Sequence, residues 1–154
     1  MLARPAGGVT GQENAMKATI SWQEDVMFTG ESGSGHQVTI DGPESEGGKN
    51  RGARPMELML MGIGGCTSFD VMKILRKARQ PVENCVAHLE ATRADEVPAV
   101  FTDIHIHFVV TGKGVKASQV KRAIELSAEK YCSASIMLGR GGVNITHDFE
   151  LVES

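Results

Sequence analysis

The first part of the chain alternates apolar and polar residues, which is the period-two pattern of half-buried β-strands. The pattern covers segments 17–22, 26–29 and 37–41. A turn rich in glycine and serine, 30–36, separates the last two segments. Three short strands joined in this way predict a three-stranded meander.

Residues 56–75 follow a different pattern, with apolar side chains on nearly every face of a predicted helix. Pro55 precedes them, and proline at the first helical position is a start signal. A helix that is apolar all round is buried, so this segment is predicted to be the central helix of the fold. Gly62, Gly64 and Gly65 interrupt it at a cost in helix stability. They indicate either close packing of another backbone or a bend.

The second half of the chain is predicted to hold three further strands and a second helix. The strand segments are 84–91, 101–111 and 143–151. The first two are linked as an antiparallel hairpin. Apolar residues spaced three and four apart predict an amphipathic helix from Val120 to Tyr131, with Cys132 at its end and a further helical turn at 136–138. The order β-β-β-α-β-β-α-β predicts an α+β fold with a largely antiparallel sheet.

The length and composition are those of one globular domain. The chain has 154 residues, of which 41% are hydrophobic and 23% charged. Residues 1–15 carry no periodicity and are predicted to be a disordered leader or tag remnant, which leaves 16–154 as a single domain. The net charge of −3 and the aromatic content of 5% argue against binding to nucleic acid.

No membrane span and no export signal are predicted. The longest uncharged apolar stretch, 58–69, is short for a bilayer and rich in glycine. The N-terminal residues lack the basic-then-apolar order of a secretory signal. Three cysteines, an odd number, do not suggest a disulfide framework. A cytoplasmic location without membrane contact is expected.

Two of the cysteines lie in contrasting settings. Cys66 ends an apolar run rich in glycine and methionine, whereas Cys132 follows a polar, amphipathic segment. If the fold brings them together, they form a reactive thiol and a resolving thiol, the minimal equipment for reducing a peroxide. Arg51 and Arg54 lie upstream of Cys66 and could lower its pKa. The alternative is that both cysteines are inert packing residues, which is the interpretation adopted for Cys85.

Two carboxylates interrupt the apolar helix and need either a partner or solvent. Glu57 is expected either to pair with an arginine, from this chain or another subunit, or to lie at the exposed start of the helix, where the helix dipole favours a negative charge. Asp70 is expected at an exposed edge of the helix.

The histidines offer a possible zinc site. His88, His105 and His107 are predicted to share one face of two neighbouring strands, and three imidazoles could bind zinc. That face also carries acidic residues and is expected to be solvated, so no metal is expected there. His147 is predicted to be a hydrogen-bonded core residue, and no other cofactor is expected.

Three segments of the chain resemble the OsmC/Ohr family of thiol peroxidases, and most closely its YhfA-like branch. They are RPMELMLMGIGGCT at 54–67, SAEKYCS at 127–133 and VNITH at 143–147. The resemblance implies an intertwined homodimer in which antiparallel sheets from both subunits wrap around central helices. It also implies two active sites at the interface, with Cys66 as the peroxidatic cysteine and Cys132 as the resolving one.

The family's site also uses an arginine and a glutamate. The arginine usually comes from the N-terminal β region, but strands 17–41 hold none, so Arg51 or Arg54 would have to substitute. The glutamate position of better-known members is Met56 here, and Glu57 follows it.

The resemblance implies reduction of organic hydroperoxides, with the resulting disulfide reduced by an external dithiol. The alternative is a non-catalytic dimer of the same fold that binds a small hydrophobic ligand at its interface.

Overall fold

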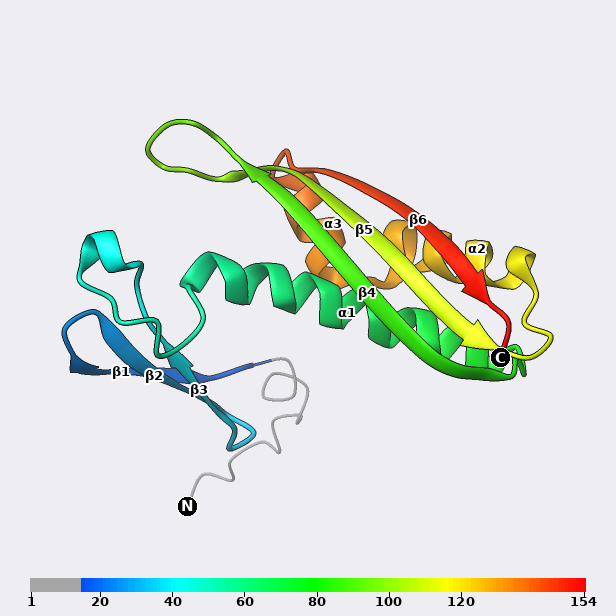
Figure 1. Cartoon of the computed structure of the whole chain (residues 1–154), viewed down its shortest axis with the longest axis horizontal. Helices are drawn as coiled ribbons and strands as arrows, with labels where there is room; N and C mark the ends of the chain where they lie inside the picture. Colours follow the sequence, from blue (N-terminus) through cyan, green and yellow to red (C-terminus); the bar gives the residue numbers. More distant parts are fainter. Residues whose placement is uncertain (1–14) are drawn as a thin grey trace, which may run out of the picture. The chain divides into compact units, whose positions relative to one another are not determined.

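The computed structural model describes residues 15–154 and has the predicted mixture of helices and strands (Figure 1). The predicted leader, residues 1–15, lies outside the described residues except for Ala15. The elements are β1 (Ala18–Glu24), β2 (Met27–Ser32), β3 (Gln37–Ile40), the short helix η2 (Glu44–Glu46), α1 (Pro55–Lys77), β4 (Val82–Arg93), β5 (Phe101–Gly112), α2 (Ala117–Leu126), η3 (Ser127–Tyr131), α3 (Ser133–Arg140) and β6 (Asn144–Val152).

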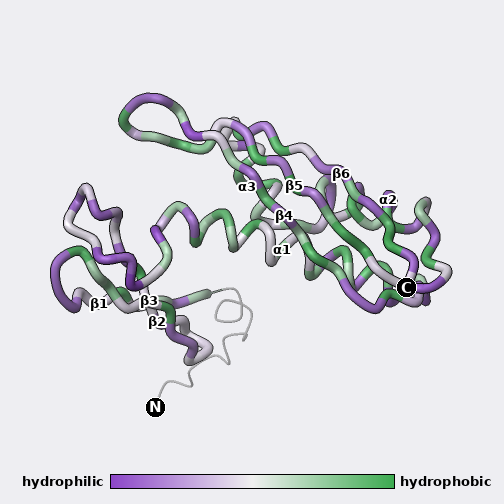
Figure 2. Tube along the Cα trace, in the orientation of Figure 1, coloured by the Kyte–Doolittle hydropathy of each residue, from purple (hydrophilic) through white to green (hydrophobic). Residues whose placement is uncertain are grey.

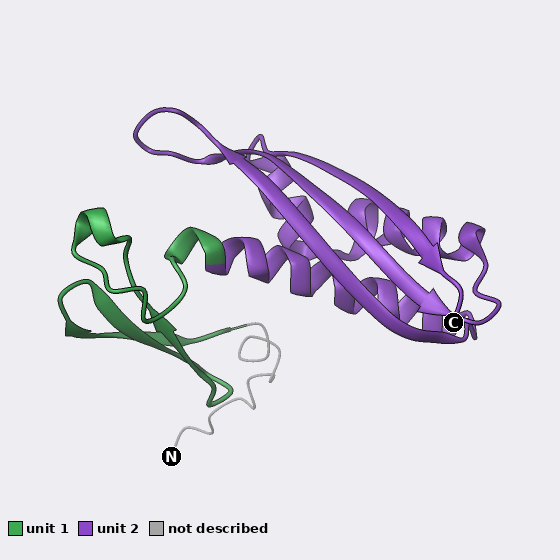
Figure 3. Cartoon of the chain, in the orientation of Figure 1, with its two compact units in different colours: residues 1–57 green, residues 58–154 purple. Residues whose placement is uncertain are grey.

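The chain divides into two compact units (Figure 3). Unit 1 ends at Glu57, and unit 2 runs from Leu58 to Ser154. The boundary falls in the first turn of α1. The single domain expected from residue 16 onwards stays a prediction.

Unit 1 contains the predicted meander, an antiparallel sheet in the order β1-β2-β3. Opposite residues in such a sheet point to the same face, so one face carries Ile20, Trp22, Phe28 and Val38. Trp22 is 65% exposed and Ile20 58% exposed. No hydrophobic side chain among the described residues of unit 1 is buried. The sheet therefore has no hydrophobic core within unit 1.

Unit 2 contains a second sheet in the order β4-β5-β6 (Figure 1). β4 and β5 form the predicted antiparallel hairpin. β5 and β6 are parallel, with Phe108 opposite Phe149. The strand pairs of the described residues are thus largely antiparallel, as predicted, and this pair is the exception. The connection through α2, η3 and α3 returns the chain to the end of the sheet where β5 began, and a parallel pair requires such a crossover.

The core of unit 2 lies against one face of this sheet. Ile104, Ile106, Phe108 and Val110 on β5 are all at most 1% exposed. The predicted inward face of β5 is therefore confirmed for these four residues. Figure 2 shows the apolar stretches along α1 and the strands of unit 2 that contribute to this core.

The central helix begins at Pro55 as predicted, but it is buried on one stripe only. Its buried residues recur at intervals of about four and are Ile63, Gly64, Thr67, Val71 and Leu75. Met61 is 58% exposed and Phe69 67% exposed. The prediction of a helix buried all round is therefore wrong within unit 2, because no other element of this unit covers the remaining apolar faces of α1.

The three glycines of α1 have different surroundings. A Cβ atom on Gly64 would lie 2.8 Å from Cδ1 of Leu89, so close packing against β4 accounts for this glycine. Among the described residues, nothing lies within 4 Å of a Cβ placed on Gly62 or Gly65. These two glycines leave the opposite side of the helix open to close approach.

α1 is also the one helix of the described residues that is long and apolar enough to cross a membrane. It has 23 residues, more than the apolar stretch 58–69 considered in the sequence. A core helix satisfies the same two criteria. The buried polar contacts of Thr67 in unit 2 are those of a helix packed against protein.

Candidate functional site

The two cysteines singled out in the sequence come together in unit 2. Their sulfur atoms lie within 4.8 Å of each other, although one is on α1 and the other follows η3. Cys66 is partly exposed, whereas Cys132 is completely buried. Cys85 lies on β4 and does not belong to this cluster. The pair therefore consists of one partly exposed cysteine and one that is shielded.

A break between two helices positions Cys132. α2 ends at Leu126, and residues Ser127–Tyr131 form a π-helical turn, a feature often found at functional sites. Cys132 then adopts an extended backbone with φ −75° and ψ 101°, and its sulfur accepts a hydrogen bond from the Ser135 N–H at 3.4 Å. Cys132 is thus the N-cap of α3. The sequence predicted a continuous helix here, followed by a single further turn.

Thr67 connects the two helical segments beneath the sulfurs. Its hydroxyl donates to the Ile63 carbonyl at 2.9 Å and lies 3.3 Å from Cys132 Sγ. It also lies 3.3 Å from Ser135 Oγ. A hydroxyl has a single hydrogen. It can therefore accept from a Cys132 thiol while donating to Ile63, or turn to donate to a Cys132 thiolate.

Asp70 belongs to the same cluster and was not expected there. Its carboxylate accepts a hydrogen bond from the Ser127 hydroxyl at 3.2 Å and lies within 4.8 Å of both sulfurs. It is partly buried rather than at an exposed edge. The exposed-edge prediction is wrong because η3 places Ser127 against this face of α1.

The surroundings shift the pKa values of the two thiols in opposite directions. Burial raises the pKa of Cys66, opposed by a hydrogen bond from the Ala134 N–H and reinforced by the neighbouring Cys132 and Asp70. Burial also disfavours ionisation of Cys132, but hydrogen bonds from Ser135 and Thr67 outweigh it and lower the pKa of Cys132. The surroundings in the single chain thus favour the thiol form of Cys66 and the thiolate form of Cys132.

Arg51 is engaged by a buried carboxylate of unit 1. Its Nε and its backbone N–H donate to Oδ2 of Asp41 at 3.0 and 3.1 Å, and its guanidinium also pairs with Glu24 and Asp25. Asp41 is completely buried. Arg51 therefore secures the loop after β3, and its proposed replacement of the family arginine stays a prediction.

These contacts predict an acid-sensitive loop. The hydrogen bonds from Arg51 hold the pKa of Asp41 well below its usual range. A carboxyl group whose pKa is lowered by folding stabilises the folded state fully at pH values above its unfolded-state pKa, near 3.8. This stabilisation is lost as the pH falls through the lower pKa of the folded state. Asp41→Asn should therefore lower stability at neutral pH and reduce its dependence on pH below about 4. Thermal melts from pH 3 to 7 would show this, and parallel melting curves for both proteins would contradict it.

Arg54 and Glu57 interact with each other at the start of α1. Oε1 of Glu57 accepts the Arg54 N–H at 2.8 Å, and the Arg54 guanidinium donates to Asn50 at 2.7 Å. A carboxylate three residues into a helix that reaches back to the N-cap N–H is half of a capping box. Both alternatives for Glu57 are therefore observed: it lies at the exposed start of the helix, and its Oε1 also lies 3.9 Å from Nε of Arg54 as an ion pair. Among the described residues, no hydrogen bond joins an arginine or lysine side chain to either sulfur.

The strand histidines are engaged by a carboxylate. Nε2 of His105 and Nδ1 of His107 lie 2.9 and 2.7 Å from the same Asp148 oxygen, and His88 stacks on His107. The predicted three-histidine group is not among the sets of closely spaced potential ligands in residues 15–154.

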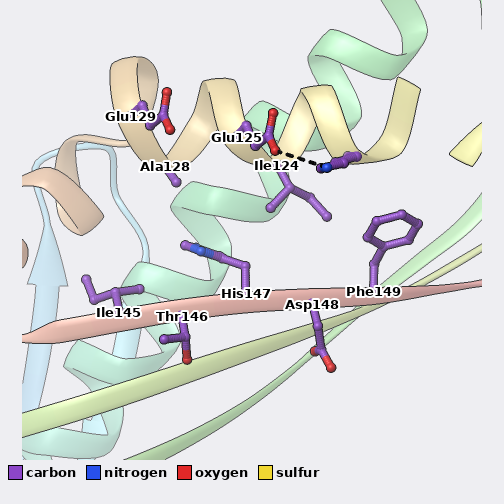
Figure 4. A pocket seen from close by; sticks show the side chains of 10 residues that line it. Ile124, Glu125, Ala128, Glu129, Ile145, Thr146, His147, Asp148 and Phe149 are labelled. Carbon is purple, nitrogen blue, oxygen red and sulfur yellow. Dashed lines mark ion pairs between the residues drawn. The ribbon is translucent and has the colours of Figure 1, made fainter. Parts of the chain in front are cut away.

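His147 projects from β6 into a pocket of about 660 Å³ beneath α2 and η3 (Figure 4). Within residues 15–154, its buried Nε2 has no hydrogen-bond partner, so the expected hydrogen bond is not observed. Burial lowers the pKa of His147, which favours the neutral ring.

The comparisons with known proteins point in one direction. Residues 47–148 match the family described as OsmC-like protein. The chain is 47% identical to protein YhfA of Escherichia coli strain K12 over 137 residues, which are 89% of this chain and 98% of YhfA. The crystal structure of a hypothetical protein from Aquifex aeolicus shares the fold with a TM-score of 0.79 and 28% identity, over 91% of this chain and 98% of that one. The organic hydroperoxide resistance protein OhrB of Bacillus subtilis shares it with a TM-score of 0.58 and 18% identity, over 88% and 98%.

Proposed function

Because this chain belongs to the OsmC-like family, we propose that it is a thiol-dependent peroxidase that reduces organic hydroperoxides through Cys66 and Cys132. The observation that carries the proposal is the pairing of a partly exposed sulfur with a buried one within 4.8 Å. OhrB, which has the same fold, is named for organic hydroperoxide resistance.

The reaction begins with the proton shared by the two sulfurs. Cys66 donates its S–H to the Cys132 thiolate. This hydrogen bond contributes to the raised pKa of Cys66 and to the lowered pKa of Cys132. Transfer of that proton leaves a thiolate on Cys66, the partly exposed cysteine. The Cys66 thiolate attacks the distal peroxide oxygen, the O–O bond breaks, and the departing alkoxide takes the proton from Cys132. The products are an alcohol and a sulfenic acid on Cys66.

The same proton transfer prepares the second step. Cys132, again a thiolate, attacks the sulfenic sulfur, and the departing hydroxide takes up a proton to give water. Thr67 and Ser135 donate hydrogen bonds to this thiolate. An external dithiol then reduces the disulfide by exchange and is itself oxidised to a disulfide. The cycle needs reduced thiols, in keeping with a cytoplasmic location.

The exposed apolar residues of α1, among them Met61 and Phe69, favour an apolar substrate. A pocket of about 520 Å³ on this helix is lined by Gly65, Ser68, Phe69, Met72, Lys73 and Arg76, and Cys66 is not among its lining residues. Apolar lining favours the alkyl group of an organic hydroperoxide over hydrogen peroxide.

A second copy of the chain completes this arrangement. The sheet of unit 1 leaves Trp22 and Ile20 exposed, and α1 leaves Met61 and Phe69 exposed. A three-stranded sheet requires cover for its apolar face, and apolar surface on this scale marks an interaction site. A homodimer buries these faces in the way the family resemblance implies. The partner is also a possible source of a cation for the Cys66 thiolate.

The test is the fate of the thiols after a single addition of hydroperoxide. One equivalent of cumene hydroperoxide added to the reduced protein should remove two thiols per chain, and peptide mapping should find Cys66 joined to Cys132. Cys85 should remain free, because it lies on β4 and does not belong to the cluster. Three free thiols per chain after treatment would contradict the proposal.

The non-catalytic alternative has one observation in its favour. The raised pKa of Cys66 in the single chain is that of an unactivated thiol. A ligand-binding dimer would keep this property after assembly. Alkylation of Cys66 in the assembled protein at the rate of an ordinary thiol, without disulfide formation, would favour that alternative.

A further inference from the structure

The site contains a set of side chains that the peroxidase cycle does not fully use. Cys66 Sγ, Cys132 Sγ and a carboxylate oxygen of Asp70 all lie within 4.8 Å of one another. Within residues 15–154 this is the one group of at least three potential metal ligands so closely spaced. Cys66 and Asp70 are four residues apart on α1 and therefore share a face of the helix. Cys132 reaches that face from the junction of η3 and α3.

This group has no positive partner in the described part of the chain. Asp70 forms none of the ion pairs found there, and its hydrogen-bond partner is the neutral hydroxyl of Ser127. Fully ionised, the cluster would hold two thiolates and a carboxylate in a partly or wholly buried setting. Such a concentration of negative charge requires protons or a cation.

The donor atoms are those that zinc prefers. Structural and catalytic zinc sites use thiolate sulfur, imidazole nitrogen and carboxylate oxygen in a tetrahedral arrangement, and three protein ligands leave one position for water. With Zn–S bonds of about 2.3 Å, tetrahedral ligand atoms lie roughly 3.5–4 Å apart. Separations of at most 4.8 Å therefore need to close by at most about 1 Å, a distance on the scale of a small side-chain adjustment.

The outer contacts also suit a metal site. The Ser127 hydroxyl binds Oδ2 of Asp70, which orients the carboxylate and leaves its other oxygen free. The Ser135 N–H and the Thr67 hydroxyl lie against Cys132 Sγ at 3.4 and 3.3 Å. Hydrogen bonds of this kind orient and tune metal ligands in known sites.

We propose that the reduced protein binds one Zn²⁺ ion, or another thiophilic divalent cation, per chain through Cys66, Cys132 and Asp70. The binding itself does not depend on the enzymatic activity. Its consequence rests on the proposed function: the metal occupies both sulfurs, so metal binding and attack on a peroxide exclude each other.

The ion must therefore dissociate before the freed thiols react, and their oxidation then removes the binding site. In the net change, the zinc-bound dithiolate, one hydroperoxide and two protons yield the disulfide, the alcohol, one water and free Zn²⁺. Both electrons come from the two sulfurs, and the metal keeps its charge. The site therefore holds zinc when reduced and loses it when oxidised.

Cobalt is the probe for this site, because Co²⁺ replaces Zn²⁺ and reports sulfur ligation through a thiolate-to-metal charge-transfer band. One equivalent of Co²⁺ added to the reduced full-length protein should produce this band together with the visible bands of tetrahedral cobalt, and Zn²⁺ should abolish both. Cys66→Ser should lose at least half of the charge-transfer intensity. Asp70→Asn should weaken binding by at least about tenfold, since even outer-sphere changes cost that much.

Two matched controls separate this site from others in the chain. Cys85→Ser should bind cobalt as the wild type does, because Cys85 lies on β4. His107→Gln should do the same, because it alters only the histidine cluster around Asp148. The disulfide form of the wild-type protein should show no cobalt bands. It removes both thiolates without a substitution, so loss of binding in this form does not arise from misfolding of a cysteine variant.

The outcomes separate the metal site from the peroxidase activity. Absence of the charge-transfer band, its persistence in the disulfide form, or equal affinity in Asp70→Asn would overturn the metal site. Cobalt binding in a protein that never reacts with hydroperoxide would support the site while removing the proposed function. Where both hold, added Zn²⁺ should slow disulfide formation by cumene hydroperoxide, and an unchanged rate would refute the mutual exclusion.

Discussion

Cys66→Ser should abolish hydroperoxide reduction, lowering dithiol-dependent turnover by at least about 10³-fold, because the attacking sulfur is lost. Cys132→Ser should behave differently. Its Cys66 can still attack one hydroperoxide, but the sulfenic acid then has no neighbouring thiol to condense with. Turnover of organic hydroperoxide with an added dithiol, together with trapping of sulfenic acid by dimedone, distinguishes the two variants.

Cys85→Ser is the control for these variants, because it removes a partly buried cysteine outside the pair. It should keep wild-type turnover. Wild-type turnover in Cys66→Ser would rule out the assignment of Cys66 as the attacking residue. A dimedone adduct on Cys132 in the wild-type protein would reverse the roles of the two sulfurs.

Trp22→Glu should dissociate the proposed homodimer. Trp22 is 65% exposed in the single chain, and a charge at a truly exposed position typically changes stability by less than about 0.5 kcal/mol. If a partner buries the indole, its loss should cost about 3–5 kcal/mol, and every 1.4 kcal/mol raises the dissociation constant about tenfold. Light scattering coupled to size-exclusion chromatography over a dilution series measures this shift.

Val97→Glu is the matched control, because Val97 is fully exposed on the loop between β4 and β5. It should leave the assembly unchanged. The wild-type protein offers a second measurement, since Trp22 is its single tryptophan. Its emission should be blue-shifted in the dimer and move to longer wavelength on dilution. The emission of a solvated indole at all concentrations, with equal masses for both variants, would argue against the dimer.

The strands were predictable because a strand with one buried face keeps a period of two. In β5 the apolar residues Ile104, Ile106 and Phe108 alternate with partly exposed residues, and they form the core as expected. The start of α1 was predictable because proline marks the first turn of a helix. These signals are local and need no knowledge of distant residues.

The parallel pairing of β5 with β6 was not predictable from the strands themselves. Strand direction depends on how α2, η3 and α3 carry the chain back along the sheet, and alternation is the same in either direction. The π-helical turn was missed because the apolar spacing from Val120 to Tyr131 fits a regular helix equally well. Cys132 therefore appeared to end a helix, whereas it begins the next one.

The candidate site was predictable in its sulfurs but not in its polar surroundings. Cys66 and Cys132 were identified from their contrasting contexts. Asp70 was misplaced because its partner Ser127 lies 57 residues away in the sequence. The four-residue spacing between Cys66 and Asp70 was the one local signal that could have placed the carboxylate on the same helical face. Similarly, nothing near Arg51 in the sequence indicated that Asp41 would engage it.

The distance along the chain between the two cysteines has a thermodynamic consequence. Their disulfide would close a loop of more than 60 residues, spanning most of unit 2. Chain-entropy arguments assign such a cross-link about 4 kcal/mol, because it restricts the unfolded ensemble. The oxidised protein should then be the more heat-resistant form, so a cell that depletes its reductant would accumulate the catalytically spent protein in its more durable state.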